Sequence, residues 1–449
     1  MLWHSRKREK TVSEPGWVEH AVWWQVYPLG FVGAYPPGGG DGKLDRITAW
    51  LDYAIELGAS GLMLGPVFAS ETHGYDTTDH LTIDPRLGGD AEFDALIAAA
   101  HDRGLRVLLD GVFNHVGRGH AAFQAVLEQG RDAPTARWFR LTWPDGAGEP
   151  QYETFEGHGA LVALNHLEPA VADYVVDVMT HWLRRGADGW RLDAAYAVPA
   201  AFWAKVLPRV RAEFPDAYLV GEVIHGDYPS FVDRSTMDSV TQYELWKAVW
   251  SSLNEGNFFE LSWALERHNL FLETFVPQTF TGNHDVTRLA SKLLDPKHVP
   301  LALVLLFTVG GTPSIYSGDE QGFTGVKEDR EHGDDAVRPP FPAGPDDLAP
   351  YGWPIYHLHQ ELIGLRRRHP WLHRARTSTV SLANEQLVYE VTDGSHKLLI
   401  ALSVGADSTM LPAPYAKMVL NGDAELKEPG SANTTVVLPA AGWAVLEAQ

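Results

Sequence analysis

Short apolar runs alternate with amphipathic segments over most of the chain, a pattern typical of parallel strands joined by helices. Segments with helical spacing, such as residues 44–57, 91–103 and 169–185, separate the runs. The eight runs that we interpret as strands lie at residues 21–28, 61–66, 105–110, 190–193, 217–222, 238–242, 276–280 and 312–316. Eight strand–helix repeats predict a closed (β/α)8 barrel of the TIM type. A doubly wound sheet would usually carry a glycine-rich phosphate loop after its first strand, and the sequence has none there.

Two parts of the chain depart from this alternation. Residues 115–168 are rich in Gly, Pro and aromatic residues and are too long for a simple loop, so we expect a small inserted domain after the third strand. From residue 374 onward, short strands separated by turn residues predict a C-terminal antiparallel β-sandwich, residues 374–449. The barrel would then be formed by residues 1–114 and 169–373, with residues 1–18 as a loose arm.

The amino-acid composition favours some classes of binding partner over others. The 449 residues include 58 Asp and Glu against 36 Lys and Arg, and the net charge of −22 would repel a nucleic-acid backbone. A neutral small molecule is a better fit, and some of the 16 Trp, 15 Tyr and 18 Phe would suit a sugar-binding cleft. The chain has no Cys, which excludes disulfides and thiolate metal sites.

The sequence also indicates where in the cell the protein is located. Residues 1–10 are polar and basic, and no apolar run of the kind found in secretory signals follows them, so we expect a cytoplasmic protein. The longest apolar stretch, residues 299–309, is too short to span a bilayer, so we expect no membrane partner.

Carboxylates end three of the predicted strands, at Asp193, Glu222 and Asp285. The C-terminal ends of barrel strands meet on one face, so we expect these acids to share a pocket. Arg191 lies on the same strand face as Asp193 and should keep it ionised as a nucleophile. A second acid with a raised pKa would protonate the leaving oxygen. The pattern predicts a retaining glycosidase with its two carboxyl groups roughly 5–5.5 Å apart.

The motifs around these acids make the chain resemble the α-amylase family, glycoside hydrolase family thirteen. They occur in the family's order and cover roughly residues 20–373. The motifs that carry the resemblance are Asp110-Gly-Val-Phe-Asn-His115, Gly189-Trp-Arg-Leu-Asp193, Val220-Gly-Glu-Val223, Thr281-Gly-Asn-His-Asp285, the strand at 61–66, His73-Gly-Tyr-Asp76 and the segment at 311–320.

The resemblance implies a catalytic role for the matching acids. Asp193 would be the nucleophile, Glu222 the general acid/base and Asp285 a stabiliser of the transition state. Arg191 would orient Asp193, and Asp110 would give structural support.

The resemblance also implies a set of substrate-binding residues. Tyr75 would stack on the sugar bound before the scissile bond, and His115 and His284 would hydrogen-bond the same sugar. Asp76 would hold a local network there, and Arg338 would line the same subsite.

The end of the insert indicates a subgroup. Leu161-Val-Ala-Leu-Asn165 resembles the variant found in cyclomaltodextrinase and neopullulanase-type members. Starch-degrading members carry a Lys-His pair after the nucleophile, and Tyr196-Ala197 replaces it here. This resemblance implies short or cyclic maltooligosaccharides with α-1,4 or α-1,6 bonds, and a hydrolase of cyclic maltosyl-maltose is one candidate.

Several alternatives stay open. Asn114 matches a position that binds calcium in many relatives, but no set of oxygen partners is visible, so we expect neither a required metal nor another cofactor. A transglycosylase or isomerase would use the same glycosyl-enzyme, and a non-catalytic sugar-binding relative would typically have lost the acids. Whether two copies form a homodimer is also left open.

Overall fold

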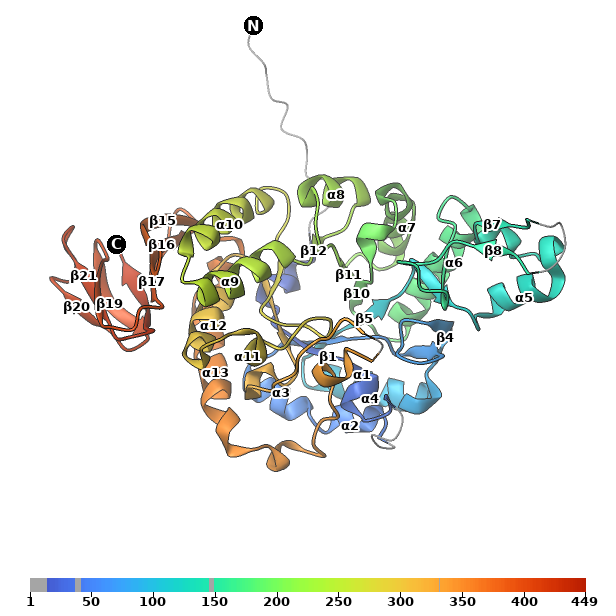
Figure 1. The fold of residues 1–449 in the computed structure, drawn as a ribbon, viewed down its shortest axis with the longest axis horizontal. Coiled ribbons are helices and arrows are strands. Elements are labelled where there is room, and N and C mark those ends of the chain that lie inside the picture. Colours follow the sequence, from blue (N-terminus) through green and yellow to red (C-terminus); the bar gives the residue numbers. More distant parts are fainter. Residues whose placement is uncertain (1–13, 37–41, 145–148, 331) are drawn as a thin grey trace, which may run out of the picture.

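The computed structural model describes residues 14–36, 42–144, 149–330 and 332–449, and it contains the expected barrel (Figure 1). Eight parallel strands form one sheet in the order β12-β11-β10-β5-β2-β1-β14-β13. A parallel bridge between Thr241 and Gln278 joins the two edge strands and closes the barrel. The strands are β1 (Trp23–Val26), β2 (Gly61–Leu64), β5 (Arg106–Gly111), β10 (Gly189–Leu192), β11 (Tyr218–Gly221), β12 (Ser239–Val240), β13 (Gln278–Phe280) and β14 (Thr312–Tyr316). Each of the eight runs interpreted as strands overlaps one of them.

Helices surround this sheet, as Figure 1 shows. The segment at 44–57 is divided into two helices, whereas we expected a continuous one. Gly58 ends the second with a φ of 106°, a left-handed conformation that glycine adopts without strain. The helices are α1 (Pro28–Phe31), α2 (Leu44–Thr48), α3 (Leu51–Leu57), α4 (Asp90–Asp102), α5 (Ala121–Gln129), α6 (Pro169–Arg184), α7 (Ala200–Glu213), α8 (Tyr228–Ser235), α9 (Tyr243–Glu255), α10 (Phe258–Phe271), α11 (Leu289–Lys292), α12 (Val299–Thr308) and α13 (Trp353–Arg368). Within the described residues, none of these helices has the length and apolar character needed to cross a bilayer.

Aromatic rings fill the N-terminal end of the barrel. The Trp23 and Tyr218 rings are stacked with centroids 6.2 Å apart, and Trp17 packs edge-on against both. Glycine at two strand positions makes room for them. A Cβ on Gly61 would lie 2.3 Å from the Trp23 ring, and one on Gly189 would lie 2.1 Å from the carbonyl oxygen of Tyr218.

The expectation of a loose arm at residues 1–18 is wrong for the part that the structure describes; residues 1–13 lie outside the described residues. Trp17 donates from its indole N–H to the carbonyl of Asp216, and Val18 is fully buried. Glu14 forms ion pairs with His373 and Arg374, where the barrel meets the C-terminal region. Apolar burial and paired charge hold this segment against the barrel.

The insert after the third strand is small and irregular. Its strands are β6 (His115–Gly117), β7 (Leu141–Thr142), β8 (Gln151–Tyr152) and β9 (Leu161–Ala163), and it also contains α5. β6 pairs with β9 and β7 pairs with β8, both antiparallel. The β6–β9 pair starts directly after β5, so it brings the insert to the C-terminal end of the barrel strands.

The C-terminal region consists of two antiparallel sheets, as expected. The strands are β15 (Arg376–Ala383), β16 (Gln386–Thr392), β17 (Lys397–Ser403), β18 (Thr409–Pro412), β19 (Ala416–Asn421), β20 (Glu425–Lys427), β21 (Thr435–Leu438) and β22 (Trp443–Ala448). The sheets have the orders β15-β16-β17-β22-β19 and β18-β21-β20. Side chains from both sheets, among them Leu399, Leu411, Val436 and Leu446, form one buried cluster between them.

Candidate active site

The C-terminal ends of three adjacent strands place three carboxyl groups around one arginine. Arg191 on β10 lies in register with Asp110 on β5 and with Val220 on β11, two residues before Glu222. Its Nη1 is 2.6 Å from Asp110 Oδ2 and 3.1 Å from Asp193 Oδ1, and its Nη2 is 3.0 Å from Glu222 Oε1. All four side chains are buried, so their charges interact with little screening.

The charge balance of this cluster differs from our expectation for Asp193. Burial raises the pKa of Asp193 well above its usual value, and the neighbouring carboxylates of Glu222 and Asp110 raise it further, against the opposing effect of Arg191. Burial likewise raises the pKa of Asp110. One guanidinium thus faces three carboxyl groups, and the repulsion among them opposes the ionisation of all three together.

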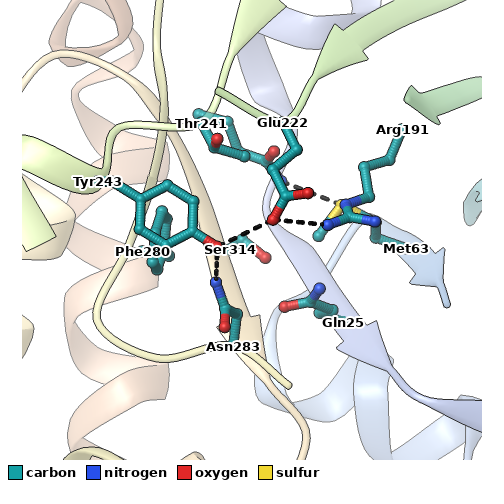
Figure 2. Close-up of a pocket in the computed structure, with 10 residues that line it drawn as sticks. Gln25, Met63, Arg191, Glu222, Thr241, Tyr243, Phe280, Asn283 and Ser314 are labelled. Atoms are coloured by element: carbon teal, nitrogen blue, oxygen red, sulfur yellow. Dashed lines mark hydrogen bonds and ion pairs between the residues drawn. The ribbon is translucent and has the colours of Figure 1, made fainter. Parts of the chain in front are cut away.

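Glu222 accepts hydrogen bonds from two donors in addition to Arg191. The backbone N–H of Ala194 donates to Oε2 over 3.0 Å, and the Tyr243 hydroxyl donates to Oε1 over 3.1 Å. Asn283 in turn donates from Nδ2 to the Tyr243 hydroxyl over 2.9 Å. Figure 2 shows this chain from Asn283 through Tyr243 to Glu222 and on to Arg191. The carboxyl group is therefore fixed in orientation before any ligand enters.

Asp285 lies in a different electrostatic environment. Its Oδ1 is 2.6 Å from Arg338 Nη2, and its Oδ2 is 3.0 Å from His284 Nε2. Burial would raise its pKa, but His284, Arg338 and Arg191 together hold the pKa well below the usual value for aspartate. Asp285 is accordingly the acid that stays ionised.

His284 is fixed between two tyrosine rings. Its ring is parallel to those of Tyr27 and Tyr75, with centroid distances of 5.9 and 5.6 Å. Gln25 Nε2 lies 3.1 Å from His284 Nδ1, so the neutral ring carries its proton on Nε2, which faces Asp285. The Tyr75 hydroxyl contacts His284 Nε2 and donates to Asp110 over 3.2 Å. Tyr75 thus links the two carboxylate groups of the site.

His115 and Asp76 are held by hydrogen bonds to neighbouring groups of the protein. His115 Nε2 donates to the Tyr75 carbonyl over 2.9 Å, and its Nδ1 accepts from Asn114 Nδ2 over 3.1 Å, so both ring nitrogens are already bonded. Burial lowers the pKa of His115 to about 4, and the ring is neutral at pH 7. Asp76 accepts from the backbone and hydroxyl of Thr72 and does not line the cavity described next.

A cavity of about 430 Å³ opens above these groups. Asp193, Glu222, Asp285, Tyr75, His115 and Arg338 all line it, so the structure brings together most of the residues that the sequence predicted. One wall comes from the insert, where Glu156 accepts a 3.0 Å hydrogen bond from the hydroxyl of Tyr196. Opposite it, Lys327 is paired with Asp334 at 3.1 Å.

The sequence analysis missed three residues that shape the site. Tyr27, at the end of the first predicted strand, carries Arg338 over its ring at 4.7 Å, and Tyr243 directly follows the sixth strand. The rule that located the acids, a polar residue at the end of a barrel strand, would have found both. Glu156 lies in the irregular insert, where no sequence pattern marks it.

A metal site has little support in the geometry. The Asn114 side chain donates from Nδ2 to His115, and the backbone carbonyl of Asn114 accepts from the backbone N–H of Leu164. In the parts of the chain that the structure describes, no three His, Asp or Glu side chains are grouped so as to hold a metal ion.

Comparison with known proteins agrees with the geometry. Residues 25–339 match the family described as alpha amylase, catalytic domain. The chain is 32% identical over 430 residues to a cyclomaltodextrinase of Geobacillus thermopakistaniensis, covering 89% of this chain and 71% of that protein. It is 31% identical over 345 residues to an intracellular maltogenic amylase of Bacillus subtilis, covering 71% of this chain and 58% of that protein.

A solved structure extends the likeness to nearly the whole chain. It is the cyclic α-maltosyl-(1→6)-maltose hydrolase from Arthrobacter globiformis in complex with that sugar, with a TM-score of 0.83 and 27% identity. The alignment covers 97% of this chain and 100% of the other. The similarity therefore includes the C-terminal sheets as well as the barrel.

Proposed function

Because the chain belongs to the alpha-amylase family, we propose that it hydrolyses α-glucosidic bonds of short or cyclic maltooligosaccharides with retention of configuration. The observation that carries this proposal is the cluster in which Arg191 contacts both Asp193 and Glu222, with Asp285 across the same cavity. A nucleophile, a proton donor and a separate anion are the groups that a retaining glycosidase needs.

In the first step, a carboxylate oxygen of Asp193 attacks the anomeric carbon of the bound glucose unit. The bond from that carbon to the leaving oxygen breaks, and Glu222 gives its proton to the leaving oxygen, so charge balances. Among the groups beside Asp193, the Arg191 guanidinium favours the ionised form that attacks. The product is a covalent glycosyl-enzyme and a released sugar.

In the second step, Glu222 takes a proton from water, and the hydroxide oxygen bonds to the anomeric carbon as the bond to Asp193 breaks. Two inversions give net retention. Asp285, held ionised by Arg338 and His284, stabilises the positive charge that develops on the sugar ring in both steps.

The substrate class is supported by the site and by the relatives. The cavity of about 430 Å³ is walled on one side by the Glu156–Tyr196 contact and on the other by the Lys327–Asp334 pair, which suits a few glucose units. The relatives are named as a cyclomaltodextrinase, a maltogenic amylase and a cyclic maltosyl-maltose hydrolase. We propose α-1,4 bonds as the main target and α-1,6 bonds as a second one.

The test is a product profile. Purified protein would be incubated with maltotriose, a cyclodextrin, panose, cyclic maltosyl-maltose and soluble starch, and the products followed by chromatography and proton NMR. We expect rapid cleavage of the small or cyclic sugars, α-anomers as the first products, and starch left nearly intact. Initial β-anomers would disprove retention, accumulation of longer or rearranged sugars would identify a transferase, and no reaction at all would identify a binding protein.

We also propose that the protein works in the cytoplasm and does not bind nucleic acid. The net charge of −22 supports the second statement, and the intracellular maltogenic amylase of Bacillus subtilis supports the first by likeness. Cell fractionation with an antibody against the full chain would test the location.

A further inference from the structure

A second groove opens beside the catalytic cavity, between α9 and α10. It has a volume of about 360 Å³, and apolar side chains form most of its lining. Ile224, Tyr243 and Trp246 line both the groove and the catalytic cavity, so the two are adjacent and share these side chains. The shared residue Tyr243 is also the donor to Glu222, which places the entrance of the groove next to the proposed proton donor.

We propose that this groove is a subsite for the glucose units of the leaving group, with Trp246 and Trp263 as its platforms. The proposal rests on the proposed function, because the side of the cavity next to the general acid is the side on which the leaving oxygen departs. A glucose chain that extends from that oxygen past Tyr243 reaches the groove.

The two tryptophans differ in burial, and each suits a different part of a sugar binding site. Trp246 is partly buried and is backed by the stacked ring of Phe280, with centroids 6.2 Å apart, and by Trp250 at 6.0 Å, so its position is fixed. Trp263 on α10 is 62% exposed and is free to cover a ligand. Flat apolar rings of this kind pack against the CH faces of a pyranose, which leaves the sugar hydroxyls at the ring edges.

The rim of the groove fits a neutral, hydroxylated ligand. Glu260 pairs with Lys247 at the lip, and Glu244 pairs with Arg267 over 3.0 Å. Because each charge has a partner, the rim offers donors and acceptors for hydroxyl groups without a net attraction for ions. This chemistry is that of an α-glucan and differs from that of a charged ligand.

The exposed face of α10 has a second candidate occupant, another copy of the chain. The experiment must distinguish this occupant from a sugar. Phe259, Trp263 and Leu270 are 51%, 62% and 57% exposed, and spacings of four and seven residues place them on one side of the helix. A second copy of the chain would cover all three. Only Trp263 lines the groove, so a sugar would depend on Trp263 alone.

The experiment compares the variants Trp263→Ala, Trp263→Phe and Phe259→Ala with the wild type. For each protein, kcat/KM would be measured on maltotriose and on maltohexaose, and the mass in solution determined by light scattering. We expect Trp263→Ala to lower the ratio of maltohexaose to maltotriose kcat/KM about tenfold, mainly through KM. Trp263→Phe should restore most of the ratio, and Phe259→Ala should match the wild type.

Two outcomes would overturn the proposal. One is an unchanged ratio in Trp263→Ala, and the other is a change of mass shared by Trp263→Ala and Phe259→Ala, which would assign the face to contacts between copies. If the wild type cleaves neither sugar, the proposed function has failed, and calorimetric titration of maltohexaose into the wild type and Trp263→Ala still decides on the groove. Equal affinity of the two proteins would then disprove it.

Discussion

The two ends of the barrel are built from the same strands and have opposite physical character. At the N-terminal end, Trp23 and Tyr218 stack in an apolar layer, with Gly61 and Gly189 leaving them space. Two residues further along β10 from Gly189, the inward-facing side chain is Arg191, which binds three carboxyl groups. The N-terminal end stabilises the fold through packing. At the C-terminal end, the crowded charges needed for catalysis reduce stability. The two ends should therefore respond to mutation in different ways.

The strongest test of the comparison is the substitution Asp193→Asn at the catalytic end. The amide keeps the shape but cannot attack the anomeric carbon, so kcat should fall by about 10³-fold or more. The raised pKa of Asp193 indicates that the ionised form is disfavoured there, so the variant should be at least as stable as the wild type. Initial rates on maltotriose and thermal melts would measure both, and full activity would show that the nucleophile is another residue.

The converse test is Trp23→Ala at the N-terminal end. Removing this fully buried ring should cost about 3–5 kcal/mol of folding free energy, seen as a lower urea midpoint. The kcat of the folded protein should stay close to that of the wild type, because Trp23 contacts no residue of the catalytic cavity lining. Trp23→Phe, which keeps a ring, should lose less. A variant that is stable but inactive would mean that the two ends are not independent.

A subtler test uses pH, with one buried group at each end of β14. Burial lowers the pKa of His268, which bonds to the carbonyl of Gly310 before the strand, to about 4. Burial raises the pKa of Asp319, after the strand, to about 6 in spite of Arg288. As pH falls from 6.5 to 4, the unfolded chain binds a proton at His268 that the folded chain does not, so His268 costs stability. Over the same range the folded chain binds a proton at Asp319 first, so Asp319 adds stability.

The variants His268→Gln and Asp319→Asn should therefore diverge. On acidification from pH 6.5 to 4, His268→Gln should become more stable relative to the wild type, and Asp319→Asn less stable. Each relative change should be on the order of 1–3 kcal/mol. Melting temperatures across this range would measure both slopes, and parallel curves for the two variants would contradict the assignment.

The smallest effect is expected from metal removal. A chelator should leave the melting temperature and the rate nearly unchanged, because the described residues contain no group of three His, Asp or Glu side chains that could hold a metal ion. Added calcium serves as the control. A drop of many degrees that calcium reverses would restore a metal site near the insert.

Much of the fold was predictable because it depends on local pattern. Short runs that alternate with helical segments located all eight barrel strands, including the two-residue β12. The motifs at the strand ends identified the acids, since strand C-termini converge in a barrel. The boundaries at residues 114, 168 and 373 stay predictions.

What escaped prediction depends on contacts between distant residues. Arg191 was expected to keep Asp193 ionised, but Asp110 and Glu222 share the same guanidinium, and no spacing reveals that sharing. Sugar binding by His115 stays a prediction, but the sequence did not indicate that both of its ring nitrogens are bonded within the protein. Residues 14–18 are held in place by Trp17 and by the contact of Glu14 with His373, more than three hundred residues away.

Closure of the barrel constrains how the chain folds during synthesis. Trp23 of β1 pairs with Ser314 of β14, so the first barrel strand to be synthesised can pair along both edges only after the last barrel strand has been made. Until then β1 carries an open edge on the ribosome, and long-range pairing of this kind is slow and exposed to aggregation. The ion pair from Glu14 to His373 can form only after β14 has emerged. The N-terminal segment and β1 therefore gain their final contacts only after the rest of the barrel has been synthesised.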